Sequence, residues 1–484
     1  MTHARKPVRN SARTSRPGRP GHPPHGNETA RHERPRTASA AGREPASPGT
    51  LSAAESGVSE ALLAAAVEAV RRLLYFAQPA DALLSAFFRE KKSGVRDRAF
   101  IAETAYAVLR RKRLLERLAG LVVYPNKPPA QQAILPRELV LLSLSRVRGL
   151  SQRQLEPALL AGEAEWLAAI RQQAEPELSL AERMDFPDWL AARLLARYPQ
   201  DAALALARAL NTPAPLDLRV NPLKATREDV LTRLRADGLE AAPCPFAPLG
   251  VRVKGRPALQ RHPLFLDGSF EVQDEGSQLL GHLLAPRRGE LVVDFCAGAG
   301  GKTLLLGALM RSTGRLYAFD IAGKRLVKLK TRVARAGLSN VHPIAIVSEN
   351  DIRVKRLAGK ADRVLVDAPC SGLGTLRRNP DLKWRQTAES VAELERKQAA
   401  ILVAAARLVK PGGRLVYATC SILDEENAAI VDAFLAAHPE FRRLPAQEVL
   451  AAQGIVVDCG EDLRLAPQTH GSDGFYAAVL ERAA

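Results

Sequence analysis

The sequence contains no run of about 18 or more apolar residues, and its N-terminus lacks the apolar stretch of a signal peptide. We therefore predict a cytoplasmic protein with no membrane partner. The five cysteines are odd in number and widely scattered, and no two of them stand in CxxC spacing. This pattern is typical of reduced thiols. It speaks against a disulfide framework or a structural zinc site, so no metal is expected.

Acidic residues are too few to balance the basic ones: 52 Asp+Glu stand against 70 Lys+Arg, a net charge of +18. Such an excess usually indicates a polyanionic partner, because neutralising phosphates releases counterions. A basic surface kept for solubility is the alternative. Residues 1–52 hold ten Lys+Arg and three Asp+Glu, so the rest of the chain still carries about +11. We predict a nucleic-acid partner and a disordered basic tail over 1–52.

Three further domains are expected from the residue patterns. Apolar residues recur at helical spacing, which predicts an all-helical domain over 53–165. Its basic run Arg110–Arg113 is either a solvated helix face or part of an RNA-binding surface. Residues 166–285 combine a helix, introduced by Asp185-Phe186-Pro187 and running through Ala205, with short strand-like segments. We expect them to form a small α+β domain.

Residues 286–484 alternate short apolar strands with helices. This alternation predicts an α/β domain with a parallel sheet covered by helices on both faces. Ligands of such sheets bind beyond the carboxyl ends of the strands. The expected strands are Leu291–Phe295, Arg315–Phe319, Val341–Val347, Arg363–Asp367, Arg414–Thr419 and Phe475–Leu480.

A turn of small residues follows the first of these strands and leads into a helix: Cys296, Ala297, Gly298, Ala299, Gly300, Gly301 and Lys302. Such a turn lets a ligand approach the backbone and the helix N-terminus. A Walker A loop would need glycine at Cys296, and a dinucleotide fingerprint would need it at Thr303. We therefore predict an S-adenosylmethionine loop. Asp320, at the end of the second strand, would accept hydrogen bonds from the ribose, and its alternative role is a helix N-cap.

Two cysteines stand at the carboxyl ends of neighbouring predicted strands, Cys370 in Asp367-Ala368-Pro369-Cys370-Ser371-Gly372 and Cys420 in Thr419-Cys420-Ser421. A buried, inert thiol is the common alternative for either one. A thiol has a use in methylating carbon 5 of cytosine, since a thiolate that adds at carbon 6 activates that poor nucleophile. Methylation of an exocyclic amine needs no thiol, and such enzymes usually carry an Asn-Pro-Pro-Tyr type motif here.

In combination, these motifs resemble the Sun-type RNA cytosine-C5 methyltransferases, most closely those of bacterial small-subunit ribosomal RNA. The resemblance covers residues 56–484. It includes Arg219-Val220-Asn221, Gln273–Gln278, Arg378-Asn379-Pro380-Asp381 and Trp384. It implies a class I (Rossmann-like) S-adenosylmethionine-dependent methyltransferase domain, preceded by the small α+β domain and an all-α NusB-like RNA-binding domain. One departure is Gly298-Ala299, where the family usually has Ala-Pro.

The resemblance also implies the roles of individual residues. Cys420 would be the nucleophile, Cys370 would assist product release, and Asp367 would hold N3 of the base beside the cofactor. Residues 296–302 and Asp320 would bind the cofactor. Asp351 is the best candidate for a further acidic contact, with Glu349 as its rival. We expect a monomer acting on small-subunit rRNA. The alternatives are a transfer RNA substrate and a non-catalytic RNA-binding assembly factor.

Overall fold

The computed structural model describes residues 57–125 and 133–484. The basic tail predicted over residues 1–52 lies outside these ranges. Within them, no helix combines the length and the hydropathy that a membrane span requires.

The first described helices share one hydrophobic core. Ser59 begins the first of them by accepting a hydrogen bond from the amide of Leu62. The last spans the boundary expected at residue 165, and its buried residues as far as Ile170 belong to the same core. The elements are α2 (Glu60–Leu73), α3 (Ala80–Glu90), α4 (Val95–Arg110), α5 (Lys112–Ala119), α6 (Pro136–Leu142), the π-helical η1 (Ser143–Val147), α7 (Gln152–Leu155), the 3-10 turn η2 (Glu156–Ala158) and α8 (Glu163–Gln172).

The basic run Arg110–Arg113 lies where α4 ends and α5 begins, and it contacts other parts of the chain. Its guanidinium groups bind the carbonyl of Arg377 at 3.0 Å, the carboxylate of Asp185 at 3.0 Å and that of Asp188 at 2.6 Å. These side chains stay partly exposed, so the structure does not decide between the two interpretations of the run. It adds that three of the four cations also contact residues far along the chain.

The helix expected through Ala205 is two helices, α10 (Asp188–Arg197) and α11 (Gln200–Leu210), preceded by α9 (Leu180–Met184). Tyr198 precedes Pro199 and is extended (φ −120°, ψ 145°), as residues before proline tend to be, and this ends α10. A small antiparallel sheet of order β2-β3-β1-β4 follows. Its elements are β1 (Leu216–Val220), α12 (Arg227–Ala236), β2 (Ala241–Pro243), β3 (Gly250–Val253), η3 (Leu259–Arg261), α13 (Pro263–Leu266) and β4 (Phe270–Val272).

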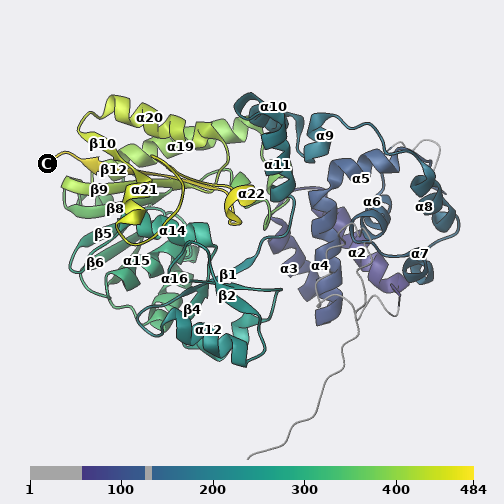
Figure 1. The fold of residues 1–484 in the computed structure, drawn as a ribbon, viewed down its shortest axis with the longest axis horizontal. Helices are drawn as coiled ribbons and strands as arrows, with labels where there is room; N and C mark the ends of the chain where they lie inside the picture. Colours follow the sequence, from purple (N-terminus) through teal and green to yellow (C-terminus); the bar gives the residue numbers. More distant parts are fainter. Residues whose placement is uncertain (1–56, 126–132) are drawn as a thin grey trace, which may run out of the picture. The chain divides into compact units, whose positions relative to one another are not determined.

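The C-terminal part is built on an eight-stranded sheet of order β10-β12-β9-β8-β5-β6-β7, with β11 paired to β12 (Figure 1). Its elements are α14 (Glu275–Leu284), β5 (Leu291–Asp294), α15 (Gly301–Leu309), β6 (Arg315–Asp320), α16 (Gly323–Ala336), β7 (Val341–Ala345), α17 (Ile352–Lys355), β8 (Ala361–Asp367), η4 (Leu373–Thr375), α18 (Leu382–Arg385), α19 (Ala388–Ala406), β9 (Val409–Thr419), η5 (Asp424–Glu426), α20 (Ala428–Ala437), β10 (Phe441–Leu444), α21 (Ala446–Ala451), β11 (Leu463–Leu465), α22 (Pro467–His470) and β12 (Phe475–Arg482).

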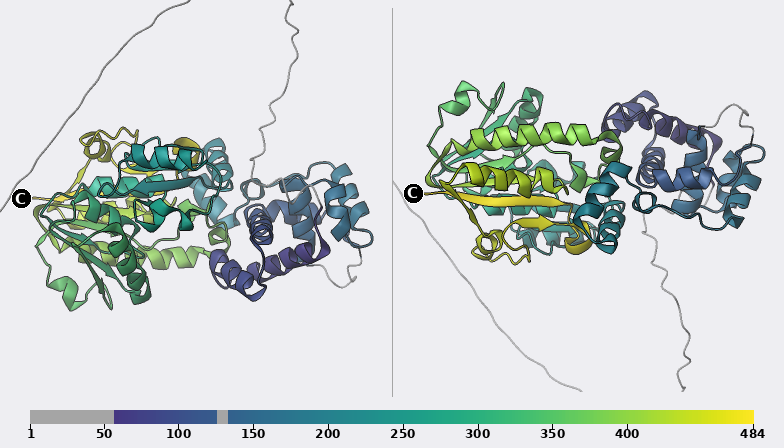
Figure 2. Two further views of the ribbon diagram at one scale, coloured as in Figure 1. Left: turned by 90° about the horizontal axis from the view of Figure 1, so that it is seen from below. Right: turned by 90° about the horizontal axis from the view of Figure 1, so that it is seen from above.

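Only part of this sheet is parallel, which corrects the expectation of a wholly parallel one. Strands β5 to β9 pair in parallel, whereas β12 runs antiparallel to β9, β10 and β11. Helices cover both faces (Figures 1 and 2). Because side chains alternate along a strand, Val292 packs on the side of α14, α15 and α16 and Val293 on the side of α19 and α20. The carboxyl ends of the parallel strands meet at one edge.

Candidate active site

The two predicted cysteines lie together at this edge, after the parallel neighbours β8 and β9. Asp367 pairs in register with Ala418, so the two loops begin level with each other. The Sγ atoms of Cys370 and Cys420 are 3.4 Å apart, and both residues are partly exposed. The hydrogen bond to Cys420 and burial raise the pKa of the Cys370 thiol well above its usual value. Cys370 therefore holds its proton beside the Cys420 sulfur.

Lys302 and Asp367 form an ion pair next to the thiols. Lys302 lies in the first turn of α15, and its Nζ is 2.7 Å from Oδ2 of Asp367. Burial alone would lower the pKa of the ammonium, but the charges of Asp367 and Cys420 raise it above its usual value. No described residue donates to Oδ1 of Asp367, whose side chain is 30% exposed. A permanent cation and a free carboxylate oxygen thus flank the sulfur atoms.

The turn after β5 leaves room for a ligand. Gly298 has φ +57°, and a Cβ placed on it would meet nothing within 4 Å. Gly300 has φ +87° and packs so closely on Leu329 that a Cβ would clash with it. No side chain caps the start of α15, so its first amides are available to an anionic group.

Asp320 completes this turn from the end of β6. Its Oδ2 accepts the amide of Gly298 at 2.8 Å and its Oδ1 that of Ala322 at 2.6 Å. The N-cap position of α16 is Ala322, so Asp320 is not a helix N-cap. An open glycine turn, an uncapped helix and an acidic group on the next strand fit S-adenosylmethionine, with its carboxylate at the helix and its ribose at Asp320.

Asp351 follows β7, beyond which the amide of Ile346 donates to the carbonyl of Asp320 at 3.1 Å. Asp351 is the N-cap of α17, and its carboxylate accepts the amide of Val347 at 3.0 Å and pairs with Arg353 at 2.6 Å. Hydrogen bonds from Arg353 hold the pKa of Asp351 far below its usual range. No contact among the described residues joins its side chain to Asp320 or to residues 296–302. Glu349, its rival, accepts a hydrogen bond only from its neighbour Asn350.

Two residues of the turn have perturbed acidity. Burial raises the pKa of the Asp294 carboxyl to about 7, opposed by the hydroxyl of Thr303, which donates to it at 2.7 Å. Burial also raises the pKa of the Cys296 thiol well above its usual value. Cys296 therefore remains a thiol, and its side chain packs against the hydrophobic core between the sheet and α19.

Residue patterns did not point to Glu426, which is buried behind both cysteines. It accepts hydrogen bonds from Ser371 and Ser421, the residues directly after Cys370 and Cys420. The sequence offers little signal, since Glu426 is the last of three consecutive acidic residues, after Asp424 and Glu425.

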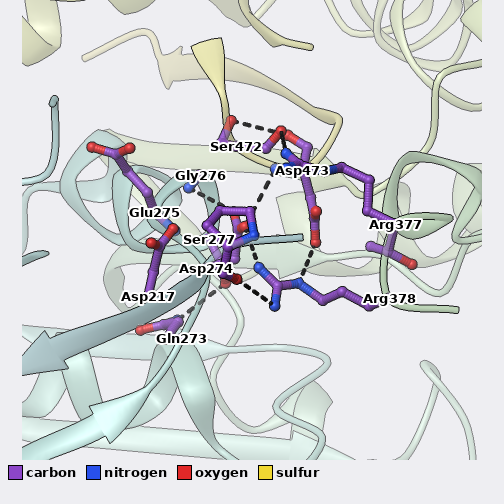
Figure 3. Close-up of polar contacts among 12 residues, drawn as sticks. Asp217, Gln273, Asp274, Glu275, Gly276, Ser277, Arg377, Arg378, Ser472 and Asp473 are labelled. Carbon is purple, nitrogen blue, oxygen red and sulfur yellow. Dashed lines mark hydrogen bonds and ion pairs between the residues drawn. The ribbon is translucent and has the colours of Figure 1, made fainter. Parts of the chain in front are cut away.

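Arg378 begins the Arg378-Asn379-Pro380-Asp381 motif, for which the sequence indicated no role. It donates to Asp473 at 2.6 Å and to Asp274 at 2.8 Å (Figure 3). The side chains of Asp274 and Asp473 are 7% and 1% exposed. Burial and the nearby charge of Asp274 raise the pKa of Asp473. The guanidinium thus joins the chain after the Cys370 loop to the start of α14 and to the turn before β12.

Comparisons with known proteins agree with this geometry. The chain matches the model of the 16S rRNA methyltransferase RsmB/F family over residues 281–481 and that of the RsmF/B-like ferredoxin-like domain over residues 186–260. A Synechocystis sp. protein named "Probable ribosomal RNA small subunit methyltransferase B" is 36% identical over 416 residues, 80% of this chain and 92% of its own.

Solved structures show the same fold. A methyltransferase homologue from Pyrococcus horikoshii is 28% identical, with a TM-score of 0.54, over 63% of this chain and 97% of its own. NSun6 from the same organism, solved with SFG, is 22% identical, with a TM-score of 0.55, over 62% of this chain and 99% of its own. The predicted family resemblance, the Rossmann-like methyltransferase domain and the small α+β domain are confirmed.

Proposed function

Because the chain belongs to the RsmB/F family of S-adenosylmethionine-dependent rRNA methyltransferases, we propose that it methylates carbon 5 of a cytosine in small-subunit rRNA through a covalent adduct of Cys420. The pair of thiols 3.4 Å apart, beside the Lys302–Asp367 ion pair, carries this proposal. A non-catalytic assembly factor would have no need of that arrangement. The names of the relatives favour small-subunit rRNA over transfer RNA as the substrate.

The cofactor is assigned to the turn after β5. Residues 296–302 surround it, Asp320 holds the ribose, and the start of α15 holds the amino-acid carboxylate. S-adenosylmethionine, when bound, supplies an electrophilic methyl group. Asp351 contacts the cofactor at the edge of this site only if its ion pair with Arg353 breaks.

Cys420 begins the reaction on the base. Its thiolate forms a bond to carbon 6, and the electron pair of the 5,6 double bond makes carbon 5 nucleophilic. The Lys302 ammonium, whose side chain is only 11% exposed, stabilises the negative charge, first on the sulfur and then on the ring. Asp367, held at one oxygen by Lys302, has its other oxygen for the N3 edge of the base. N3 and a carboxylate both accept hydrogen bonds, so this contact forms when N3 has taken up a proton from water.

Cys370 ends the reaction once carbon 5 carries the methyl group. The hydrogen bond to Cys420 is the largest cause of the raised pKa of Cys370. In the adduct the Cys420 sulfur is a neutral thioether, so the largest cause of the raised pKa of Cys370 is gone and the thiol can give its proton to water. Its thiolate then removes the proton on carbon 5, the 5,6 double bond reforms, and the bond between carbon 6 and Cys420 breaks.

The helical region from Glu60 to Gln172 is assigned to RNA binding, as a NusB-like domain, and the base must leave its stack to reach the thiols. The proposal is tested by mapping 5-methylcytosine in small-subunit rRNA from cells with and without the gene. One cytosine should lose its methyl group and regain it when purified protein and S-adenosylmethionine are added. Loss of a methyl group from a transfer RNA, or from an atom other than carbon 5, would contradict the proposal.

A further inference from the structure

Glu426 is a carboxyl group with no exposed surface, and no cation pairs with it among the described residues. Hydrogen bonds take the place of a counter-ion. Oε1 accepts the amide of Ser371 at 2.8 Å and the amide nitrogen of Gln398 at 3.0 Å. Oε2 accepts the hydroxyls of Ser371, at 2.5 Å, and of Ser421. Burying a carboxylate costs free energy unless hydrogen bonds occupy its acceptor positions. The four donors are therefore held in place around Glu426.

The two serines place this carboxylate between the catalytic loops. Ser371 follows Cys370 and Ser421 follows Cys420, and their hydroxyls also lie 3.2 Å from each other. Each hydroxyl accepts an amide two residues further on, from Leu373 at 3.5 Å and Leu423 at 3.1 Å. Neither hydroxyl can turn away without losing two hydrogen bonds.

Asn427, the residue after Glu426, binds the residues on either side of Cys420. The amide group of Asn427 accepts the hydroxyl of Thr419 and donates to the carbonyl of Ser421 at 3.1 Å. The hydroxyl of Tyr417 fixes this turn by donating to the carbonyl of Glu426 at 2.7 Å. Gln398 also donates to the carbonyl of Pro369, on the Cys370 side, at 3.0 Å. The backbone on both sides of each thiol is therefore tied to one buried cluster.

Building on the proposed function, we propose that Glu426 is a positioning residue that sets the separation of the two sulfur atoms and so couples attack by Cys420 to release by Cys370. It touches neither the base nor the cofactor. The negative charge of Glu426 adds to the hydrogen bond and the burial that raise the pKa of Cys370. Its loss therefore alters both the place and the acidity of the releasing thiol.

The test uses the full-length protein and compares Glu426→Gln with Glu425→Gln. Glutamine keeps the size of the side chain, but its NH2 group is a donor and would face donors that the carboxylate of Glu426 accepts. Glu425 is the matched control, since it is 41% exposed and pairs with Arg193 at 3.2 Å on the surface. In Glu426→Gln, kcat should fall about 10- to 100-fold, as for a misplacement of about 1 Å, with the KM for RNA and the Kd for S-adenosylmethionine unchanged. Glu425→Gln should match the wild type.

Two further variants apply if Glu426→Gln does not fold. Ser371→Ala should lengthen the life of the protein–RNA adduct, because it loosens the Cys370 loop, and Ser421→Ala should slow adduct formation. Wild-type kcat in a folded Glu426→Gln, or identical effects of the two serine variants on both steps, would overturn the positioning role. A wild-type protein that forms no 5-methylcytosine would instead overturn the proposed function.

Discussion

Asp320 binds the backbone on both sides of the cofactor turn, through the amides of Gly298 and Ala322, and is proposed to bind the ribose as well. Asp320→Ala should therefore weaken S-adenosylmethionine binding by about 1–3 kcal/mol, as for the loss of charged hydrogen bonds. Titration calorimetry measures the change. Asp229, whose carboxylate also accepts a backbone amide, that of Thr226 before α12, is the control. Asp229→Ala should leave the affinity unchanged, and unchanged affinity in Asp320→Ala would remove Asp320 from the site.

Asp294 makes the stability of the fold depend on pH. Its pKa is about 7 in the folded protein and about 4 in an unfolded chain, so unfolding releases a proton between these values. Its contribution is complete below pH 4 and is lost as the pH rises to about 7, a difference of about 4 kcal/mol. Asp294→Asn keeps the oxygen that Thr303 contacts and cannot ionise.

The measurement for Asp294 is urea unfolding from pH 4 to pH 8. The variant should lose less stability than the wild type as the pH rises, and should be the more stable of the two at pH 8. Parallel stability curves for the two proteins would show that Asp294 is ionised throughout.

At the scale of the secondary-structure elements, Arg378 links the start of α14 to the turn before β12. Its guanidinium pairs with Asp274 and Asp473, so Arg378→Met removes the ion-pair partner of two carboxylates with little exposed surface. The free energy of unfolding should fall by about 3 kcal/mol, as when one partner of a buried pair is removed. Arg71→Met, which breaks an exposed pair with Glu68, should change the stability far less.

A second substitution tests the reason for that loss. Asp473→Asn in the Arg378→Met background removes one unpaired charge and should recover part of the stability, because burial and Asp274 already raise the pKa of Asp473. Urea unfolding of the four proteins gives the coupling between the two sites. Additive losses would show that Arg378 acts through packing alone.

Elements with a strong local pattern could be predicted from the sequence. The strands ending at Asp367 and Thr419 were expected at those residues, because short apolar runs and following turns mark them. The antiparallel direction of β12 could not be predicted, because the alternation of strands and helices does not indicate which way the last strand runs. The division at Pro199 was also missed, although the proline is a local signal.

The predicted site residues came from motifs. The structure joins Cys370 to Cys420, Lys302 to Asp367 and Asp320 to Gly298, and among the described residues it shows no such contact for the side chain of Asp351. Their supporting contacts could not be predicted in this way. Glu426 is 55 residues from Ser371 along the chain, and Arg378 is 104 residues from Asp274. Periodicity reports neighbours a few residues away, so a buried polar contact at such a separation leaves no local pattern.

On the scale of the whole molecule, the charge of +18 predicts RNA binding through many phosphate contacts. Affinity should fall steeply with salt, each contact adding about 0.7–0.9 to the slope of log K against log salt. Deleting residues 1–52 removes a net charge of about +7 and should lower that slope while the same cytosine is methylated. Filter binding over a range of salt, with mapping of the product, measures both. A change in the methylated cytosine would show that the tail reads sequence.

Covalent catalysis by Cys420 is tested most directly by trapping the adduct on a denaturing gel. Cys370→Ala should still attack carbon 6 but stall before release, leaving a slow-migrating protein–RNA band that disappears on nuclease treatment. Cys420→Ala should form no band and transfer no methyl group, because carbon 6 is never attacked. A band from Cys420→Ala and none from Cys370→Ala would exchange the two roles. Full turnover by both variants would contradict covalent catalysis by the thiol pair.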